Sequence, residues 1–168
     1  REAQVAALAQ SLSEGEVMAY GCVWGGLAAA DHAGVKGLTY DPRVYLLRVG
    51  CIGQLDPSVL ARAFVEGANG LILIGCPPDD CHHSYGLDHT WSRVNVLKKL
   101  LEFAGQDRRR IALAHVDLNK PEDYIVVVER FIKLINELGP IDRTPHNQEM
   151  IRGIYDTVNN PRVRWVLG

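Results

Sequence analysis

Four short apolar runs alternate with helical segments, and this alternation constrains the fold more than any other feature of the sequence. The apolar runs cover residues 17–23, 44–49, 70–75 and 111–116. Helices are expected over residues 2–13, 27–34, 58–66, 94–104 and 121–138. The four runs are too uniformly apolar to leave one face in water, which is typical of parallel strands with helices on both sides of a sheet.

Right-handed crossovers between parallel strands leave few ways to connect four such units. We therefore predict an α/β fold: a flavodoxin-like open parallel sheet of about four strands in the order 2-1-3-4, with flanking helices, an N-terminal helix and a C-terminal tail. Residues 1–16 are expected to form a leading helix or linker, and residues 17–140 the α/β domain. Residues 141–168 are expected to be a docking tail with a short helix near 148–156.

Composition and charge narrow the possible functions. The chain has 168 residues and 47% hydrophobic content, enough for one core, and its net charge of −2 gives no indication of a nucleic-acid partner. The apolar runs fall far short of the ~20 residues that span a bilayer. The sequence shows no basic-then-apolar leader, so we expect a cytoplasmic protein, in which cysteines are more often metal ligands or redox groups than disulfides.

All four cysteines of the chain lie at or after the ends of predicted strands. Cys22 ends the first strand, Cys51 follows the second, Cys76 follows the third, and Cys81 lies in the loop beyond it. Because the carboxyl ends of parallel strands meet at one edge of a sheet, the four sulfur atoms should converge there.

Several interpretations of these cysteines are open from the residues alone. The spacing of Cys76 and Cys81 is similar to the CxxxxC of one plant-type [2Fe-2S] loop, and an iron-sulfur cluster is the leading interpretation. A structural zinc accepts four thiolates, but its usual knuckles hold two close pairs, and this chain has one. Redox thiols, disulfides or simple core packing are the remaining alternatives.

Residues around the second pair of cysteines fit a metal-binding loop. Prolines at 77 and 78 stiffen the loop and leave the amides of residues 79–82 free to point at sulfur. His82 is a candidate ligand, hydrogen-bond donor to sulfur or proton acceptor. Asp80 would disfavour reduction if it faced a cluster, although such residues more often cap a turn. Gly53, Asp80 and His82 are the residues that we expect beside the ligands.

Several motifs resemble one known family. They are ADHAGV at 30–35, YDPRV at 40–44, RVGCIGQLDP at 48–57, EGANGLILIGCPPDDCH at 66–82 and SRV at 92–94. In this order and spacing they are similar to the iron-sulfur delta subunit of methyl-viologen-reducing hydrogenase over about residues 19–140. The resemblance implies an electron-transfer subunit that carries one [2Fe-2S] cluster. It would relay electrons between a hydrogenase or formate dehydrogenase and the flavoprotein subunit of heterodisulfide reductase.

The resemblance also implies which residues bind the cluster. The ligands would be Cys22, Cys51, Cys76 and Cys81, and residues 17–140 would be the [2Fe-2S]-binding domain. The family has a CxxC in the first strand-end loop, where this chain has Gly25 at the second position. Since related domains occur as fusions to the flavoprotein, a chain that starts at Arg1 rather than methionine would suit a fusion.

Two functions of other classes compete with electron transfer. One is a zinc-stabilised scaffold module of a multisubunit complex. The other is a flavin-binding enzyme, but GCVWGGLAAA after the first strand offers no hydroxyl to bind phosphate, and the chain lacks GxGxxG and GxxxxGK[ST] loops. Gly25 and Gly26 are interpreted as turn glycines. His115 and Asp117 form no catalytic constellation, and the arginines at 108–110 are expected to be solvated or to face a partner.

Overall fold

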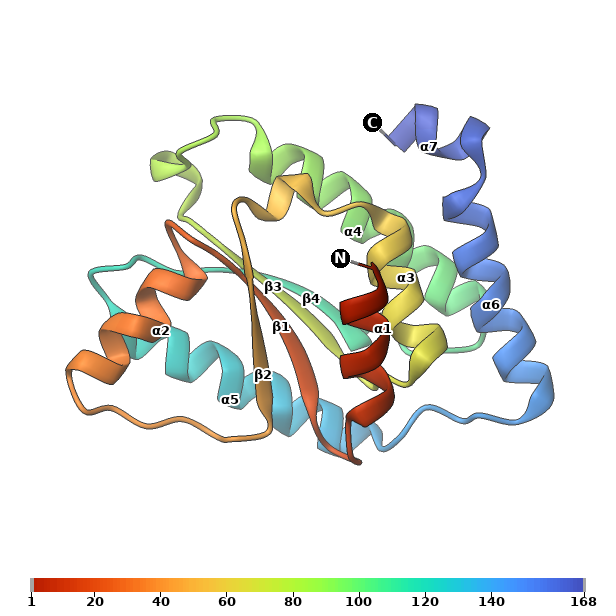
Figure 1. The fold of residues 1–168 in the computed structure, drawn as a ribbon, viewed down its shortest axis with the longest axis horizontal. Coiled ribbons are helices and arrows are strands. Elements are labelled where there is room, and N and C mark those ends of the chain that lie inside the picture. The colour runs from red at the N-terminus through yellow and green to blue at the C-terminus, as the bar shows by residue number, and fades with distance from the viewer. Residues whose placement is uncertain (1, 168) are drawn as a thin grey trace.

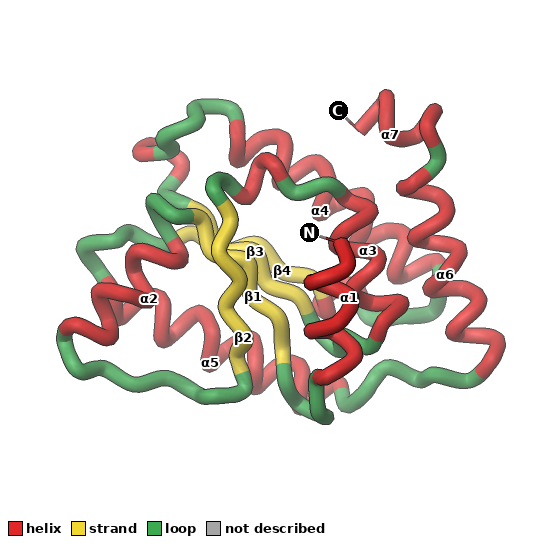
Figure 2. The backbone as a smooth tube through the Cα atoms, viewed as in Figure 1, coloured by secondary structure: helices red, strands yellow, loops and turns green. Residues whose placement is uncertain are grey.

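The structure, a computed structural model, describes residues 2–167. Figures 1 and 2 show a sheet between two layers of helices. The elements in chain order are α1 (Glu2–Ser11), β1 (Val17–Cys22), α2 (Gly26–Val35), β2 (Val44–Val49), η1 (Ile52–Gln54), α3 (Pro57–Glu66), β3 (Leu71–Gly75), η2 (Pro78–Asp80), α4 (Gly86–Phe103), η3 (Arg108–Arg110), β4 (Ile111–His115), α5 (Pro121–Leu138), α6 (Pro145–Asn159) and α7 (Pro161–Leu167).

The four strands form one parallel sheet in the order β2-β1-β3-β4, which confirms the predicted class and strand order. The register aligns the carboxyl ends: Cys22 lies opposite Val49 of β2, and Gly75 of β3 lies opposite His115 of β4. The end of β1 and the segments that follow β2 and β3, which carry the cysteines, therefore lie at the same edge of the sheet.

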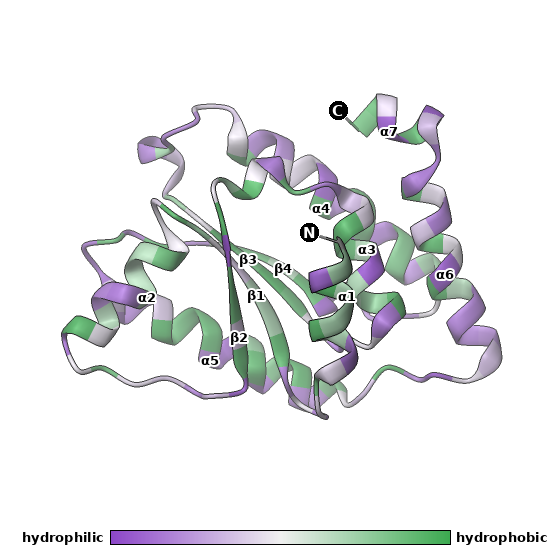
Figure 3. Cartoon of the chain, viewed as in Figure 1, coloured by the Kyte–Doolittle hydropathy of each residue, from purple (hydrophilic) through white to green (hydrophobic). Residues whose placement is uncertain are grey.

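Helices cover both faces of the sheet (Figure 1). On one face, α2 and α5 pack against Val17 and Ala19 of β1 and the alternate residues of β3. On the other, α1, α3, α4 and α6 pack against Met18 and Tyr20. Alternating side chains of each strand thus enter two separate cores, which explains why β1 and β3 are apolar throughout (Figure 3).

The outer strands are less buried than the sequence analysis predicted. In β2, Tyr45 and Arg48 are exposed, and in β4 only Ile111 is buried. Both strands lie at the edges of the sheet, where one side has no neighbouring strand. The expectation that no strand exposes side chains to solvent is therefore wrong for β2 and β4. It holds for the two central strands.

The C-terminal segment contains more helix than the sequence analysis predicted. Helix α6 begins at Pro145, where the Thr144 hydroxyl accepts a hydrogen bond from the N–H of Asn147 at 3.4 Å. Its buried face joins the core beside α3 through residues three and four positions apart: Ile151, Ile154 and Val158. Within residues 2–167, no helix combines the length and apolar character needed to cross a membrane.

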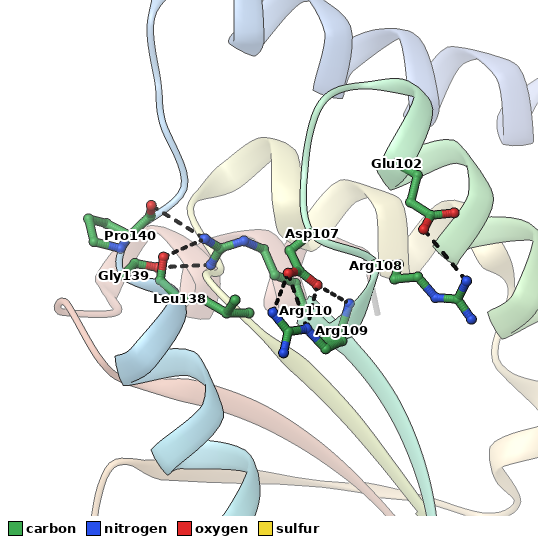
Figure 4. Close-up of polar contacts among 8 residues, drawn as sticks. All are labelled: Glu102, Asp107, Arg108, Arg109, Arg110, Leu138, Gly139 and Pro140. Carbon is green, nitrogen blue, oxygen red and sulfur yellow. Dashed lines mark hydrogen bonds and ion pairs between the residues drawn. The ribbon is translucent and has the colours of Figure 1, made fainter.

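One arginine of the 108–110 run is buried, contrary to expectation (Figure 4). Arg110 is 5% exposed, and its guanidinium donates hydrogen bonds to the carbonyls of Asn69, Leu138, Gly139 and Pro140 at 3.0–3.5 Å. Three of these carbonyls belong to the end of α5 or directly follow it, where a helix leaves its last carbonyls unpaired and favours a cation. Its neighbours pair at the surface, Arg108 with Glu102 and Arg109 with Asp107.

Candidate metal centre

The four thiols lie where the sequence analysis predicted that they would gather, at the carboxyl edge of the sheet. Cys22 is the last residue of β1, and Cys51 and Cys76 follow β2 and β3. These three residues are buried, whereas Cys81, after η2, is only partly buried. All four are free thiols.

Two of the sulfur atoms are in contact. The Sγ atoms of Cys22 and Cys76 lie 3.6 Å apart, although 54 positions separate the two residues in the chain. Two thiolates on one tetrahedral metal, with bonds of about 2.3 Å, are separated by roughly 3.8 Å. The buried pair therefore has the spacing of two ligands on one metal.

The other two sulfur atoms flank the first residue of α4. A Cβ atom placed on Gly86 would lie 2.8 Å from the Sγ of Cys51 and 3.9 Å from the Sγ of Cys81. The first turn of α4 can approach these thiols because position 86 has no side chain. A Cβ on Gly53 would in turn lie 2.6 Å from the carbonyl oxygen of Gly86, so two glycines are needed for this close approach.

Electrostatic effects between the thiols connect both pairs. Burial, together with a smaller contribution from the nearby thiols of Cys22 and Cys81, raises the pKa of Cys76 to about 12. Burial also raises the pKa of Cys51, again with contributions from Cys22 and Cys81. Cys22 and Cys81 are thus close enough to both Cys51 and Cys76 to influence the pKa values of these two thiols, as expected for one common site.

Backbone N–H groups face two of the sulfur atoms. The N–H of Gly53 points at the Sγ of Cys51 at 3.4 Å, and the N–H of His82 lowers the pKa of Cys76 by a hydrogen bond to its sulfur. Such donors stabilise negative charge on sulfur. The N–H of Asp80 instead donates to the carbonyl of Pro77 at 3.1 Å, and the Asp80 side chain is exposed.

The sequence analysis interpreted Gly25 as a turn glycine, but the structure shows that the backbone packs tightly against it. A Cβ on Gly25 would lie 2.6 Å from the backbone nitrogen of Cys76 and from the carbonyl carbon of Gly75. The turn after β1 therefore lies directly against the end of β3. A cysteine at position 25, as in the CxxC of the resembled family, would require this backbone to move.

Two residues near the thiols were not identified as functional from the sequence. Trp24 stacks on the ring of His82, with centroids 4.4 Å apart and an interplanar angle of 4°. Arg93 of α4 donates to the carbonyls of Gly53 at 2.8 Å and Leu55 at 3.3 Å, which holds the segment after Cys51. Two features of the sequence could have drawn attention to them. Trp24 is a large aromatic residue in a turn of small residues, and Arg93 is the arginine of the SRV motif.

His115 also contacts the site, but through the backbone. Its Nδ1–H donates to the carbonyl of Cys76 at 3.1 Å, which links the end of β4 to the segment after β3. Arg93 makes a further link, because its Nε donates to the carbonyl of Leu167 in α7 at 3.1 Å. The last helix is thus connected to the same residue that holds the loop of Cys51.

The donor set fits a metal centre that binds through sulfur. The site has four cysteines, and the backbone N–H groups of Gly53, Gln54 and His82 are directed at sulfur. In the described part of the chain, no three side chains of His, Cys, Asp or Glu are close enough together to hold one metal ion. These observations define a class of protein: a parallel α/β fold that gathers four thiols at the carboxyl edge of its sheet.

Comparison with known sequences identifies the family within this class. The profile described as "Methyl-viologen-reducing hydrogenase, delta subunit" matches residues 17–139, and the chain belongs to this family. This confirms the resemblance found in the sequence.

Three curated relatives show the kinds of protein to which the chain is similar. The chain is 31% identical to the vhc iron-sulfur subunit of the F420-non-reducing hydrogenase of Methanococcus voltae, over 76% of this chain and 88% of the relative. It is 32% identical to the iron-sulfur subunit of the F420-non-reducing hydrogenase of Archaeoglobus profundus, over 76% and 93%. It is 29% identical to one subunit of the ferredoxin:CoB-CoM heterodisulfide reductase of Methanosarcina mazei, over 74% of this chain but only 16% of that protein.

Proposed function

We propose that this chain holds one [2Fe-2S] cluster through Cys22, Cys51, Cys76 and Cys81 and passes electrons between larger redox proteins. The observation that carries the proposal is the gathering of four free thiols at one edge of the sheet, with one buried pair 3.6 Å apart. The printed names of the two hydrogenase relatives, which describe iron-sulfur subunits, support it.

The arrangement of the thiols supports two metal ions rather than one. A single zinc ion would need four ligands around one point. Among the described residues, Cys22 and Cys76 are that close, and Cys51 and Cys81 both lie beside Gly86. A cluster of two irons takes four cysteine ligands spread over two metal positions, which matches two separate pairs better.

Residues of the chain would make an added electron less costly. When bound, the cluster would supply a centre that accepts one electron and gives it up again. The N–H groups of Gly53 and His82 stabilise negative charge on sulfur. Burial of three thiols keeps water away from them, and partly buried Cys81 marks the side nearest the surface. One electron enters and one leaves, and no bond of the chain forms or breaks.

The partners that we propose are large redox proteins. The electron donor would be a hydrogenase or formate dehydrogenase subunit, and the acceptor a flavoprotein of the heterodisulfide reductase type. The relative from Methanosarcina mazei supports this acceptor, because the matching segment there is part of a chain named as a heterodisulfide reductase subunit. A reducing cytoplasm would be the proposed setting, since free thiols persist there.

The proposed division of labour follows the segments of the chain. Residues 17–140 would bind the cluster, with residues 1–16 as a leading helix or linker. Residues 141–168 would act as a docking tail. Contacts of α6 with α3, and of Arg164 in α7 with Asp56 at the start of α3, support a tail that docks on this domain.

Substitution of a proposed ligand tests the function. Cys76→Ser should abolish or distort the electron paramagnetic resonance signal of the anaerobically reduced protein. It should also stop the reduced protein from bleaching the flavin of a heterodisulfide reductase-type flavoprotein. His83→Ala is the matched control, since His83 is an exposed residue of the same loop. An unchanged spectrum and flavin bleaching in Cys76→Ser would show that the ligand assignment is wrong.

A further inference from the structure

A pair of stacked rings joins the two segments that carry Cys22 and Cys81. Trp24 lies two positions after Cys22, and His82 directly follows Cys81. Their centroids are 4.4 Å apart and their planes differ by 4°. Trp24 is 49% exposed and His82 is exposed, so the stack lies at the surface of the molecule.

The segment that carries Cys81 has few other anchors. Its turn hydrogen bonds are local: the N–H of Asp80 donates to Pro77, the N–H of Ser84 to Cys81, and the N–H of Gly86 to His83. The N–H of His82, which faces the sulfur of Cys76, is a contact beyond this segment. Among the described residues, the ring stack is a side-chain contact that ties this segment to the turn after β1.

We propose that Trp24 and His82 form an aromatic latch that holds the Cys81 segment closed over the metal centre and limits the access of water. This inference rests on the proposed function, because it assigns a role beside the cluster to residues that are not ligands. A parallel stack of exposed rings excludes solvent between them and adds attraction beyond the area buried. Trp24 and His82 are thus positioning residues that act through Cys81.

The rate at which iron is lost tests the latch directly. We compare the anaerobically reconstituted wild type with Trp24→Ala, His82→Ala and His82→Phe, and measure iron release to a ferrous chelator. Both alanine variants should release iron about threefold to tenfold faster, the effect expected for the loss of one ring stack. His82→Phe keeps a ring and should stay within about twofold of the wild type. It would fail to do so if His82 were a ligand.

Trp91→Ala is the matched control for these variants. Trp91 lies on α4 and is 65% exposed, and among the described residues it has no ring partner. Removal of Trp91 should leave the rate of iron release unchanged. Equal acceleration in Trp91→Ala would show that the loss of any exposed tryptophan has this effect, and would overturn the latch.

The reduction potential separates the latch from a role in folding alone. Water stabilises the more negative, reduced centre, so opening the latch should make the potential more positive in both alanine variants and not in His82→Phe. A residue needed only for folding would lower the unfolding midpoint and leave the potential of the folded protein unchanged. That outcome would overturn the latch.

The stack can also be followed without metal. In a chain with Trp91→Phe and Trp165→Phe, Trp24 is the remaining tryptophan. Adding His82→Ala should increase quenching of its fluorescence by acrylamide about twofold, and adding His82→Phe should not. Unchanged quenching would overturn the stack itself.

The two proposals fail in different ways. A wild-type chain that takes up no iron would overturn the proposed function, and the latch with it. A loaded chain whose alanine variants match the wild type in iron release and in potential would overturn the latch alone.

Discussion

Gly25 shows how strongly single residues control the geometry around the thiols. A Cβ at this position would collide with the backbone of Gly75 and Cys76. We predict that Gly25→Ala lowers the free energy of unfolding by about 1–3 kcal/mol, the usual cost of overpacking, and weakens metal uptake. Gly34→Ala is the control, because Gly34 lies in α2 with no atom near its missing Cβ, and it should raise stability by about 0.5–1 kcal/mol. Chemical denaturation measures the free energy of unfolding of both variants. Equal changes in Gly25→Ala and Gly34→Ala would contradict the tight packing at Gly25.

The buried thiol of Cys76 gives the metal-free protein a characteristic pH dependence. Burial raises its pKa from 9.0 to about 12, so the folded state keeps this proton in a pH range where the unfolded state has lost it. The stabilisation is complete below pH 9 and is lost as the pH rises towards 12. Cys76→Ala lacks the titrating group, and its free energy of unfolding should fall less steeply above pH 9. Denaturation curves at pH 8 to 10.5 test this, and identical slopes would contradict it.

At the residue scale the sequence predicted the positions of the cysteines in the fold better than their surroundings. The positions of Cys22, Cys51 and Cys76 follow from topology alone, because parallel strands bring their ends to one edge. The stack of Trp24 on His82 depends on the conformation of two irregular segments, for which no periodic pattern exists. The burial of Arg110 depends on where α5 ends in space, which the local sequence does not contain.

At the scale of elements, Arg110 connects the start of β4 to the end of α5. Its guanidinium donates to the carbonyl of Asn69 in a buried contact and to three carbonyls at the end of α5 in partly buried contacts (Figure 4). We predict that Arg110→Met lowers the free energy of unfolding by about 3 kcal/mol, since one buried and three partly buried acceptors would lose a charged donor. Arg109→Met should lower stability much less than Arg110→Met, because the pair of Arg109 with Asp107 is at the surface. Thermal or chemical denaturation measures the stability of both variants. Equal losses of stability in Arg110→Met and Arg109→Met would exclude the proposed capping of α5.

Elements with a repeating pattern were the easiest to predict. Helix α5 and strand β2 have the predicted bounds, since the first has a continuous apolar stripe and the second is β-branched and ends at Gly50. Helix α6 is longer than predicted because its polar outer face hides a narrow stripe of three buried residues. Helix α7 was not predicted: it has seven residues and leaves Trp165 exposed, so its sequence carries no apolar period.

At the scale of the whole molecule, the fold places the site at one edge of the sheet, where Cys22 and Cys76 still belong to the core. Two layers of helices stabilise the sheet, and the thiols are supplied by the segments that leave its carboxyl edge (Figure 1). The same 17–139 region covers most of a small hydrogenase subunit but only a minor part of a much longer heterodisulfide reductase chain. A unit with its own core and an edge-located site is suited to both settings, because few of its site residues depend on the rest of a larger chain.

The most direct test of the account counts iron and acid-labile sulfide in the anaerobically purified or reconstituted chain. If the thiols at the carboxyl edge of the sheet hold a binuclear cluster, each chain should contain about two irons and two sulfides. One zinc per chain, or no bound metal with four titratable thiols, would contradict the central claim.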